Sequence, residues 1–385
     1  MNILLLTESV DSYATGSLVG AFEKKKHTVT IVRPKDLYLF VSSHQSGFDR
    51  VYRDVKGQMV RILANEFDIV YPRIGANLRF GATILNHLNF NVGIYSPIPA
   101  DGLLMASDKF QTTQLCSQFG IRTPRTIMYY GGDSVDQLIE KVGGVPVVVK
   151  QLFGSQGTAV SLLDSMQAVR SVLDSFAKAG ISVLVQEFID AGGKDFRVFC
   201  VGGKVAASYQ RVAPKGEFRA NISGGGHGIK AEITKEEEYL CLLAAQAVDL
   251  PVAGVDFIRA KDGQPFLIED NGNAGFHVEK VTGISVADAI VDFVEQDFAL
   301  HGKDRNKVQA DRRDTTQLLQ NLTDEAKKVS KVIDPIINDE YLKSLLAEHK
   351  GETLDFTDRE GQRQQRQLKS LSDLVYIMSQ TFKIQ

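Results

Sequence analysis

Two apolar segments on either side of an Asp-Gly turn constrain this chain more than any other feature. Residues 254–258 and 265–268 are rich in strand-forming side chains, and residues 262–263 supply the Asp-Gly pair between them. Alternating apolar segments that flank such a turn are typical of a β-hairpin. The sequence therefore predicts two antiparallel strands at this position.

Three oxygen-bearing side chains belong to this expected hairpin. Asp256 lies in the first strand, and Glu269 and Asn271 lie two apart after the second apolar segment, so they point the same way on extended backbone. Pairing across the hairpin is expected to bring Asp256 near them. Two carboxylates and an amide oxygen suit Mg²⁺, which usually holds phosphate as well, and so indicate a nucleoside triphosphate. The alternative is that these acidic residues are simply solvated.

Composition bounds the rest of the interpretation. A length of 385 residues is typical of two or three domains, and 43% hydrophobic with 24% charged residues is ordinary for a soluble protein. A net charge of −3 argues against nucleic acid as the main partner. The cysteines are widely spaced, form no metal or redox motif and favour a reduced cytosolic setting; they are Cys116, Cys200 and Cys241.

No targeting or membrane segment is expected. The first residues lack the basic start and long apolar run of a signal peptide. No window approaches the roughly 18 apolar residues that a membrane-spanning helix needs. We therefore expect a cytoplasmic protein without a membrane partner.

The first hundred residues alternate between short apolar segments and helical patterns, which predicts an N-terminal parallel α/β domain over residues 1–100. The expected strands are residues 2–6, 28–32, 67–71 and 92–95, with helices at 18–25 and 81–88.

The middle of the chain mixes helices with strands that favour antiparallel pairing, so the whole chain is expected to be α/β and α+β. Expected helices are residues 108–119, 167–176, 236–247 and 286–298. Expected strands before the hairpin are residues 126–129, 145–150, 159–162, 183–188, 195–201 and 204–209.

Residues 301–385 change in character, with few glycines, many glutamines and balanced charge. We expect a C-terminal helical extension that packs on the core, on a second subunit or on a partner. One helical face would carry Leu368, Leu371, Leu374, Val375 and Met378.

A lysine and a glycine-containing loop form a second candidate site. Lys150 ends an expected strand and precedes Gly154, Ser155, Gln156 and Gly157. Loop amides can surround phosphate oxygens, and a neighbouring lysine supplies a positive charge. The loop lacks the Gly-Lys-Ser/Thr ending of a P-loop. An ordinary turn is the alternative.

The next strand ends offer further polar groups. Glu187, Phe188 and Ile189 end an apolar strand, where backbone groups, a carboxylate and apolar walls suit an adenine edge; an ordinary strand end is the alternative. Arg219 and Asn221 precede a run of three glycines. Arginine stabilises charge on a transferring phosphoryl group, although such arginines can equally form a solvated face.

The order of these motifs resembles the ATP-grasp superfamily, and in particular the RimK-like carboxylate–amine ligases. The resemblance covers roughly residues 70–297, and before that a looser α/β likeness remains. It is carried by YPRIGA at 71–76, SDKFQTTQLCSQFGIRTPRT at 107–126, VVVKQLFGSQGTAV at 147–160, QEFI at 186–189, GEFRANISGGG at 216–226, GVDFIRA at 254–260 and IEDNGNAGF at 268–276.

The resemblance implies how the chain is divided and which residues hold ATP. Residues 101–182 would form the small subdomain with the glycine loop, 183–300 the central and C-terminal subdomain with the metal site, and 301–385 the helical extension. It implies that ATP phosphates contact Lys109, Lys150 and the loop of Gly154, Ser155, Gln156 and Gly157. It further implies that adenine contacts Glu187, Phe188 and Ile189, and that ribose lies near Asp195.

It also implies the reacting end of the site. Two Mg²⁺ ions, or Mn²⁺, would be held by Asp256, Glu269 and Asn271. Catalytic contacts with the transferring phosphate and acyl phosphate would come from Arg219, Asn221 and Arg211. Substrate contacts would come from Arg73, Arg197 and Asn273.

The family's activity joins a carboxylate to an amine through an acyl phosphate and releases ADP. The amine donor would be an amino acid and the acceptor a small acid, a peptide or a protein, in an enzyme expected to be a homo-oligomer. The alternative is an ATP-grasp phosphotransferase, or a non-ligating ATP-binding protein whose extension binds a partner. One departure is Asp270, where relatives carry an apolar residue; it is expected to point away from Glu269, toward solvent or substrate.

Overall fold

The computed structural model describes residues 1–41, 49–152, 160–302, 353–357 and 363–367. The chain divides into two compact units, Met1–Ala310 and Asp311–Gln385, and each is considered by itself. Among the described residues, no helix has the length and apolar character needed to cross a membrane.

A parallel sheet opens the first unit, as the alternation of strands and helices predicts. Its strand order is β2-β1-β6, and both neighbours of β1 run parallel to it. The elements of this region are β1 (Asn2–Thr7), α1 (Tyr13–Lys24), β2 (Thr28–Val32), β6 (Ile69–Arg73), α2 (Leu78–Asn86) and the π-helical turn η3 (His87–Val92). The strand expected at residues 92–95 is reduced to a single parallel bridge between Ile69 and Tyr95.

An antiparallel sheet lies between β2 and β6 in the sequence, where no strand was expected. It consists of β3 (Leu37–Val41), β4 (Asp49–Val55) and β5 (Gln58–Ile62), with short 3₁₀ turns η1 (Pro34–Asp36) and η2 (Ala64–Glu66) around it. Lys56 and Gly57 both have positive φ, which is the conformation that a two-residue hairpin turn requires. Buried Leu37, Val51 and Ile62 attach the sheet to the main core.

Two helices lead out of this region. They are α3 (Ala100–Ser107) and α4 (Lys109–Gln118). The Asp108 carboxylate caps α4 by accepting hydrogen bonds from the amides of Phe110 and Gln111. Leu103 and Cys116 of these helices belong to the same buried core as the parallel sheet.

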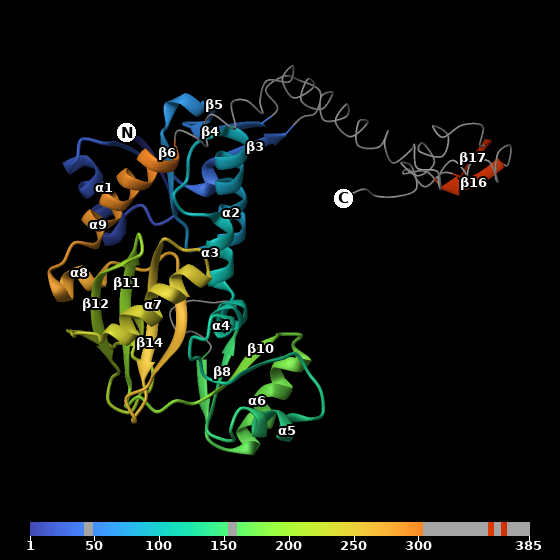
Figure 1. Ribbon diagram of the computed structural model, residues 1–385, viewed down its shortest axis with the longest axis vertical. Helices are drawn as coiled ribbons and strands as arrows, with labels where there is room; N and C mark the ends of the chain where they lie inside the picture. The colour runs from blue at the N-terminus through green and yellow to red at the C-terminus, as the bar shows by residue number, and fades with distance from the viewer. Residues whose placement is uncertain (42–48, 153–159, 303–352, 358–362, 368–385) are drawn as a thin grey trace, which may run out of the picture. The chain divides into compact units, whose positions relative to one another are not determined.

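A four-stranded antiparallel sheet with two helices has a core of its own. Its strand order is β7-β10-β8-β9, and the core includes Val149, Leu173 and Val185. The elements are β7 (Thr126–Tyr129), α5 (Val135–Lys141), β8 (Val147–Gln151), β9 (Val160–Leu163), α6 (Met166–Lys178) and β10 (Val183–Glu187). Figure 1 shows this region in green, with α5 and α6 together beside the sheet. We propose that the small subdomain begins near Thr126 rather than at residue 101, because its core does.

A five-stranded antiparallel sheet, ordered β13-β12-β11-β14-β15, carries the candidate site. It is built from β11 (Lys194–Val201), β12 (Lys204–Val212), β13 (His227–Lys230), β14 (Val252–Arg259) and β15 (Pro265–Asn271). The other elements of this region are η4 (Ile222–Gly224), α7 (Lys235–Ala247), α8 (His277–Thr282), α9 (Val286–Asp297) and η5 (Phe298–Gly302). In Figure 1, α7 runs across this sheet.

Ion pairs and hydrogen bonds join this sheet region to the N-terminal region. Lys24 of α1 pairs with Asp288 of α9 at 3.1 Å, and Ser17 donates to Glu279 at 2.8 Å. The two regions also share one continuous apolar core. The N-terminal region and the five-stranded sheet are therefore packed as one body.

The described part of the second unit is a hairpin rather than a helix. Strands β16 (Thr353–Thr357) and β17 (Arg363–Gln367) pair antiparallel. A helical extension is therefore wrong for these ten positions, because Thr353, Phe356 and Thr357 favour a strand. The expected helical face at residues 368–378 lies outside the described residues.

Candidate active site

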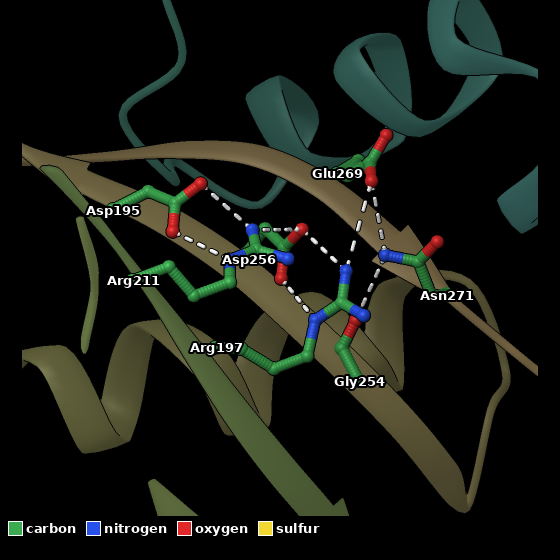
Figure 2. A network of polar contacts seen from close by, with 7 residues as sticks. All are labelled: Asp195, Arg197, Arg211, Gly254, Asp256, Glu269 and Asn271. Atoms are coloured by element: carbon green, nitrogen blue, oxygen red, sulfur yellow. Dashed lines mark hydrogen bonds and ion pairs between the residues drawn. The ribbon is translucent and has the colours of Figure 1, made fainter. Parts of the chain in front are cut away.

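The β14–β15 hairpin brings the three expected metal ligands together. Asp256 lies opposite Glu269, and Gly254 lies opposite Asn271. The Asn271 amide Nδ2 donates to Glu269 Oε1 and to the Gly254 carbonyl, both at 3.2 Å. Figure 2 shows these side chains on the same face of the sheet. The hairpin geometry expected from the Asp-Gly turn is thus confirmed.

Two arginines from the neighbouring strands bind the same cluster. Arg197 of β11 donates from Nε and Nη2 to the two oxygens of Asp256 at 2.5 Å each, and its Nη2 lies 3.8 Å from Glu269. Arg211 of β12 donates to the two oxygens of Asp195 at 2.6 and 2.7 Å, and to Asp256 at 2.7 Å. The dashed lines in Figure 2 follow this continuous network across β12, β11, β14 and β15.

Burial and charge set the ionisation of the network. Burial alone would raise the pKa of Asp256, but Arg197 and Arg211 outweigh it and hold that pKa below its usual value. Burial raises the pKa of Asp195 to about 6 against the opposing charge of Arg211. The pKa of Arg211 lies well above its usual value: burial opposes the charge, but the carboxylates of Asp256 and Asp195 overcome it.

The remaining acceptor atoms of the cluster fit a divalent cation. Within the described ranges, Oδ1 of Asn271 and Oε2 of Glu269 accept no hydrogen bond. A carboxylate has about four acceptor positions, and Asp256 uses three of them for arginine N–H groups. Hard oxygen donors therefore remain on all three side chains, which is what Mg²⁺ requires.

A buried lysine faces this cluster from the small subdomain. Lys150 is 7% exposed, and burial lowers its pKa to about 8, with Glu269 raising it and Lys109 lowering it. No ion pair to Lys150 occurs in the part of the chain that the structure describes. A buried ammonium without a carboxylate partner is costly, and a phosphate group would satisfy it. The expected loop of Gly154, Ser155, Gln156 and Gly157 lies outside the described residues.

In the expected adenine segment, residues 187–189, the Glu187 carboxylate is bound within the chain. The Glu187 carboxylate is held by Arg125, whose Nε and Nη2 donate to it at 2.9 and 2.7 Å. This pair lowers the pKa of Glu187. The carboxylate is therefore committed within the chain, and the Glu187 amide also donates to the Arg125 carbonyl at 2.8 Å. Phe188 meets Phe218 edge to face at 6.3 Å, while Ile189 follows it in the loop after β10.

Arg219 and Asn221 lie on the loop between β12 and β13. Arg219 donates to Glu217 at 3.0 and 2.9 Å and is half-buried. A side chain at Gly226 would meet the Ala220 carbonyl at 2.2 Å, so the loop closes on itself only with glycine there. The glycine run thus folds back against the segment that carries both candidate residues.

Arg73 and Asn273 lie on contacting segments, Arg73 at the end of β6 and Asn273 after β15 of the β14–β15 hairpin. Arg73 ends β6, is 9% exposed and donates from Nη1 to the Ala274 carbonyl at 3.0 Å. Its guanidinium lies 4.8 Å from the ring centroid of Phe276. The third expected substrate contact, Arg197, is instead bound to Asp256.

Asp270 points to the opposite face of β15 and is buried there. Its pKa is raised to about 8 by burial and by Asp256 and Glu269. Cys116 is its hydrogen-bond partner, at 4.0 Å from Sγ to Oδ2. The expectation that Asp270 faces solvent or substrate is wrong, because alternate residues of a strand face opposite ways and α4 covers this face.

The sequence interpretation did not identify Arg125. In the sequence, Arg125 is simply an arginine that precedes β7. Its partner, Glu187, ends β10, the strand that pairs antiparallel with β7. Such a pairing depends on strand order, which spacing does not reveal.

Comparisons with known proteins cover most of the chain. Residues 1–102 match the model of the RimK PreATP-grasp domain, and residues 106–294 match the RimK-like ATP-grasp domain. A protein of Nitrosococcus oceani named as a probable alpha-L-glutamate ligase is 36% identical over 310 residues. That alignment covers 80% of this chain and 99% of the relative.

Solved structures share the fold at low sequence identity. The ATP-grasp ligase PsnB, complexed with minimal precursor, Mg and ADP, matches with a TM-score of 0.58 at 16% identity, over 77% of this chain and 97% of that one. The D-alanine–D-alanine ligase of Bacillus anthracis, complexed with ATP, matches with a TM-score of 0.56 at 16% identity, over 79% and 99%. The chain belongs to the RimK-like ATP-grasp family, whose members use ATP and Mg²⁺, and it is an ADP-forming carbon–nitrogen ligase.

Proposed function

We propose that this ligase joins the amino group of an amino acid to the carboxylate of a small acid, a peptide or a protein through an acyl phosphate. The observation that carries the proposal is the position of Lys150. This buried cation, which has no ion pair among the described residues, lies beside Glu269 of an oxygen-rich cluster that suits Mg²⁺.

The ATP-binding roles proposed here are those that the family resemblance implies. Lys109 and Lys150 would neutralise the phosphates, with the loop from Gly154 to Gly157 over them. The backbone of Glu187, Phe188 and Ile189 would contact adenine, and Asp195 would lie near the ribose. Two Mg²⁺ ions on Asp256, Glu269 and Asn271 would screen the negative charge of the phosphates.

The first step forms the acyl phosphate. A carboxylate oxygen of the acceptor attacks the γ-phosphorus, the bond to the bridging oxygen breaks, and ADP leaves with that electron pair. Lys150 would offset charge on the transferring group. Arg219 and Asn221 would donate hydrogen bonds to its equatorial oxygens.

The second step forms the amide. The neutral amine attacks the acyl carbon, the bond from that carbon to the phosphate oxygen breaks, and phosphate leaves with the electron pair. The nitrogen loses its extra proton to solvent. The developing oxyanion requires positive neighbours, which Arg219 would supply.

Arg197 and Arg211 fit a positioning role better than direct contact with substrate. Both guanidiniums are engaged by Asp195 and Asp256, and both arginines are largely buried. They would hold Asp256 ionised and oriented toward the cation. This assignment replaces the expected catalytic and substrate contacts of these two residues.

The relatives narrow the choice of donor. Because a relative with 36% identity is named as a glutamate ligase, L-glutamate is the first donor to test. Because the PsnB structure contains a precursor, peptides with free carboxylates are the first acceptors to test.

The test is a screen for phosphate release over pairs of carboxylates and amines, with mass spectrometry of the product. We expect ADP and phosphate to form only when both substrates are present, and the product to gain one amide. Added hydroxylamine should trap the acyl phosphate as a hydroxamate. Lys150→Met should abolish turnover, while the exposed Lys178→Met on α6 should not change it. ATP binding without turnover across the panel would contradict the proposal.

A further inference from the structure

Two buried polar atoms beside the metal hairpin have no partner. Nε of Arg73 and Oδ1 of Asn273 are inaccessible to solvent and form no hydrogen bond within the described part of the chain. Burial lowers the pKa of Arg73, and no carboxylate there pairs with it. Buried polar atoms usually have partners, and a buried guanidinium without an anion is costly. A ligand that supplied both partners would remove this cost.

Arg73 and Asn273 belong to segments that contact each other. Arg73 donates to the carbonyl of Ala274, the residue that follows Asn273. A side chain at Gly75 would lie 2.8 Å from Nδ2 of Asn273, so the segment after β6 packs closely on the segment after β15. Gly75 and Gly275 are both exposed, so solvent reaches the edge of this contact.

Asn273 also lies close to the candidate cation ligands. It is two residues beyond Asn271. Two residues span at most about 7 Å of extended chain. A group held by Asn273 is therefore near the carboxylate that the proposed reaction activates.

The chemistry of the unsatisfied atoms identifies the ligand. Arg73 offers N–H donors on a cation, which match a carboxylate, and Asn273 offers an amide oxygen, which accepts from N–H. Resting on the proposed function, we infer that Arg73 binds the α-carboxylate of the amine-donating amino acid. We further infer that Oδ1 of Asn273 accepts a hydrogen bond from its α-amino group.

This arrangement assigns separate places to the two carboxylates of the reaction. The acceptor carboxylate must meet the γ-phosphate beside Lys150 and the cation ligands. Arg73 lies on another element, at the carboxyl end of β6. The second carboxylate is therefore the donor's. A hydrogen bond from the amine to Asn273 leaves the nitrogen lone pair available for attack on the acyl carbon.

The test compares two donors that differ by one carboxylate, L-glutamate and γ-aminobutyrate. We expect the ligase to prefer L-glutamate by about 100-fold in kcat/KM, the order expected for a charge-assisted bidentate contact. In Arg73→Gln the preference should fall below about fivefold, with Arg73→Lys intermediate. The KM for ATP should stay within about twofold in both variants, since Arg73 is not placed at the nucleotide.

A steric variant tests Asn273 without touching Arg73. Gly75→Ala introduces a methyl group at the 2.8 Å contact with the Asn273 amide. We expect the KM for L-glutamate to rise at least about tenfold while the KM for ATP is unchanged. Arg79→Gln is the matched control, because Arg79 is an exposed arginine on the neighbouring helix α2.

The outcomes separate this inference from the proposed function. If Arg73→Gln lowers kcat/KM equally for both donors, Arg73 only joins β6 to Phe276. If the preference for L-glutamate is unchanged, Arg73 does not bind the donor. Either result overturns the inference while ligation stands. Absence of amide with every donor would overturn the proposed function itself. If a urea titration of Arg73→Gln shows no cooperative unfolding transition, that variant is not folded, and the KM values of Gly75→Ala decide the question alone.

Discussion

Arg211 donates a 2.7 Å hydrogen bond to Asp256, and both side chains are almost completely buried. The same guanidinium also binds both oxygens of Asp195. One arginine on β12 thus fixes two carboxylates that sequence resemblance assigns to different parts of the nucleotide. Removing it would leave two buried negative charges with a single arginine, Arg197, for compensation.

We therefore expect Arg211→Gln to lower the free energy of unfolding by about 3–5 kcal/mol, the order found when one partner of a buried ion pair is removed. Urea titration of the ATP-free protein measures this. Arg170→Gln is the control, since Arg170 forms a similar bidentate pair with Asp136 in an exposed position. Its loss should cost less than about 1 kcal/mol. Equal costs for the two variants would refute the role given to Arg211.

Lys150 should make ATP affinity depend on pH. Burial lowers its pKa to about 8, so the ammonium is charged below that pH and neutral above it. We expect the Kd for ATP to be constant near pH 7 and to rise above pH 8, because a neutral amine attracts phosphate weakly. Calorimetric titration across this range measures the effect. Lys150→Arg, whose charge persists at all these pH values, should show a flat profile.

The same lysine should destabilise the ATP-free protein. Its folded pKa lies below the unfolded value, so the unfolded chain binds the extra proton between about pH 8 and pH 10.5. The cost is fully present below pH 8 and disappears as the pH rises toward 10.5. Lys150→Met should therefore raise the free energy of unfolding at pH 7 by about 3–4 kcal/mol, at roughly 1.4 kcal/mol per pKa unit. If Lys150→Met were less stable than the unsubstituted protein, the buried ammonium of Lys150 would not be destabilising in the ATP-free state.

The part of the site that spacing could predict is the part that is local in sequence. Asp256 and Glu269 are joined by one hairpin, which the Asp-Gly turn predicts. Their exact pairing depends on a β-bulge at Asp256 and Phe257, which shifts the register by one residue. Alternation along β15 likewise separates Asp270 from Glu269. Its burial could not be read from the sequence, because that depends on α4 packing against the strand from more than a hundred residues away.

The arginine network could not be predicted because it depends on strand order. Arg197 of β11 can contact Asp256 of β14 because these two strands are neighbours in the sheet, with β12 on the other side of β11. The sheet of β3, β4 and β5 was missed for a different reason. Its turn uses Lys56 and Gly57, and a lysine at positive φ is an uncommon turn residue.

Glu187 provides a test of how adenine is bound. Because its carboxylate is held by Arg125, we expect Glu187→Gln to change the Kd for ATP by less than about threefold. The backbone groups that would contact adenine are unchanged by this substitution. Arg125→Ala should weaken ATP binding more than Glu187→Gln does, because Arg125 links the strands that lead into and out of the small subdomain. A tenfold or larger loss in Glu187→Gln would restore a direct role for the carboxylate.

Among the described residues, the buried members of the two cores run from Ile3 to Val294, and the alignment with the Nitrosococcus relative covers 99% of that protein in 310 residues. We therefore expect a chain ending at Gly302 to fold, with a urea midpoint within about 0.3 M of the full chain, since it keeps every residue described in these two cores. Ligation of small donors and acceptors should persist within about threefold. If the removed residues recruit a macromolecular acceptor, the KM for a protein acceptor should rise while that for a short peptide acceptor does not. Loss of activity toward both acceptors, with folding intact, would instead place part of the reaction machinery beyond residue 302.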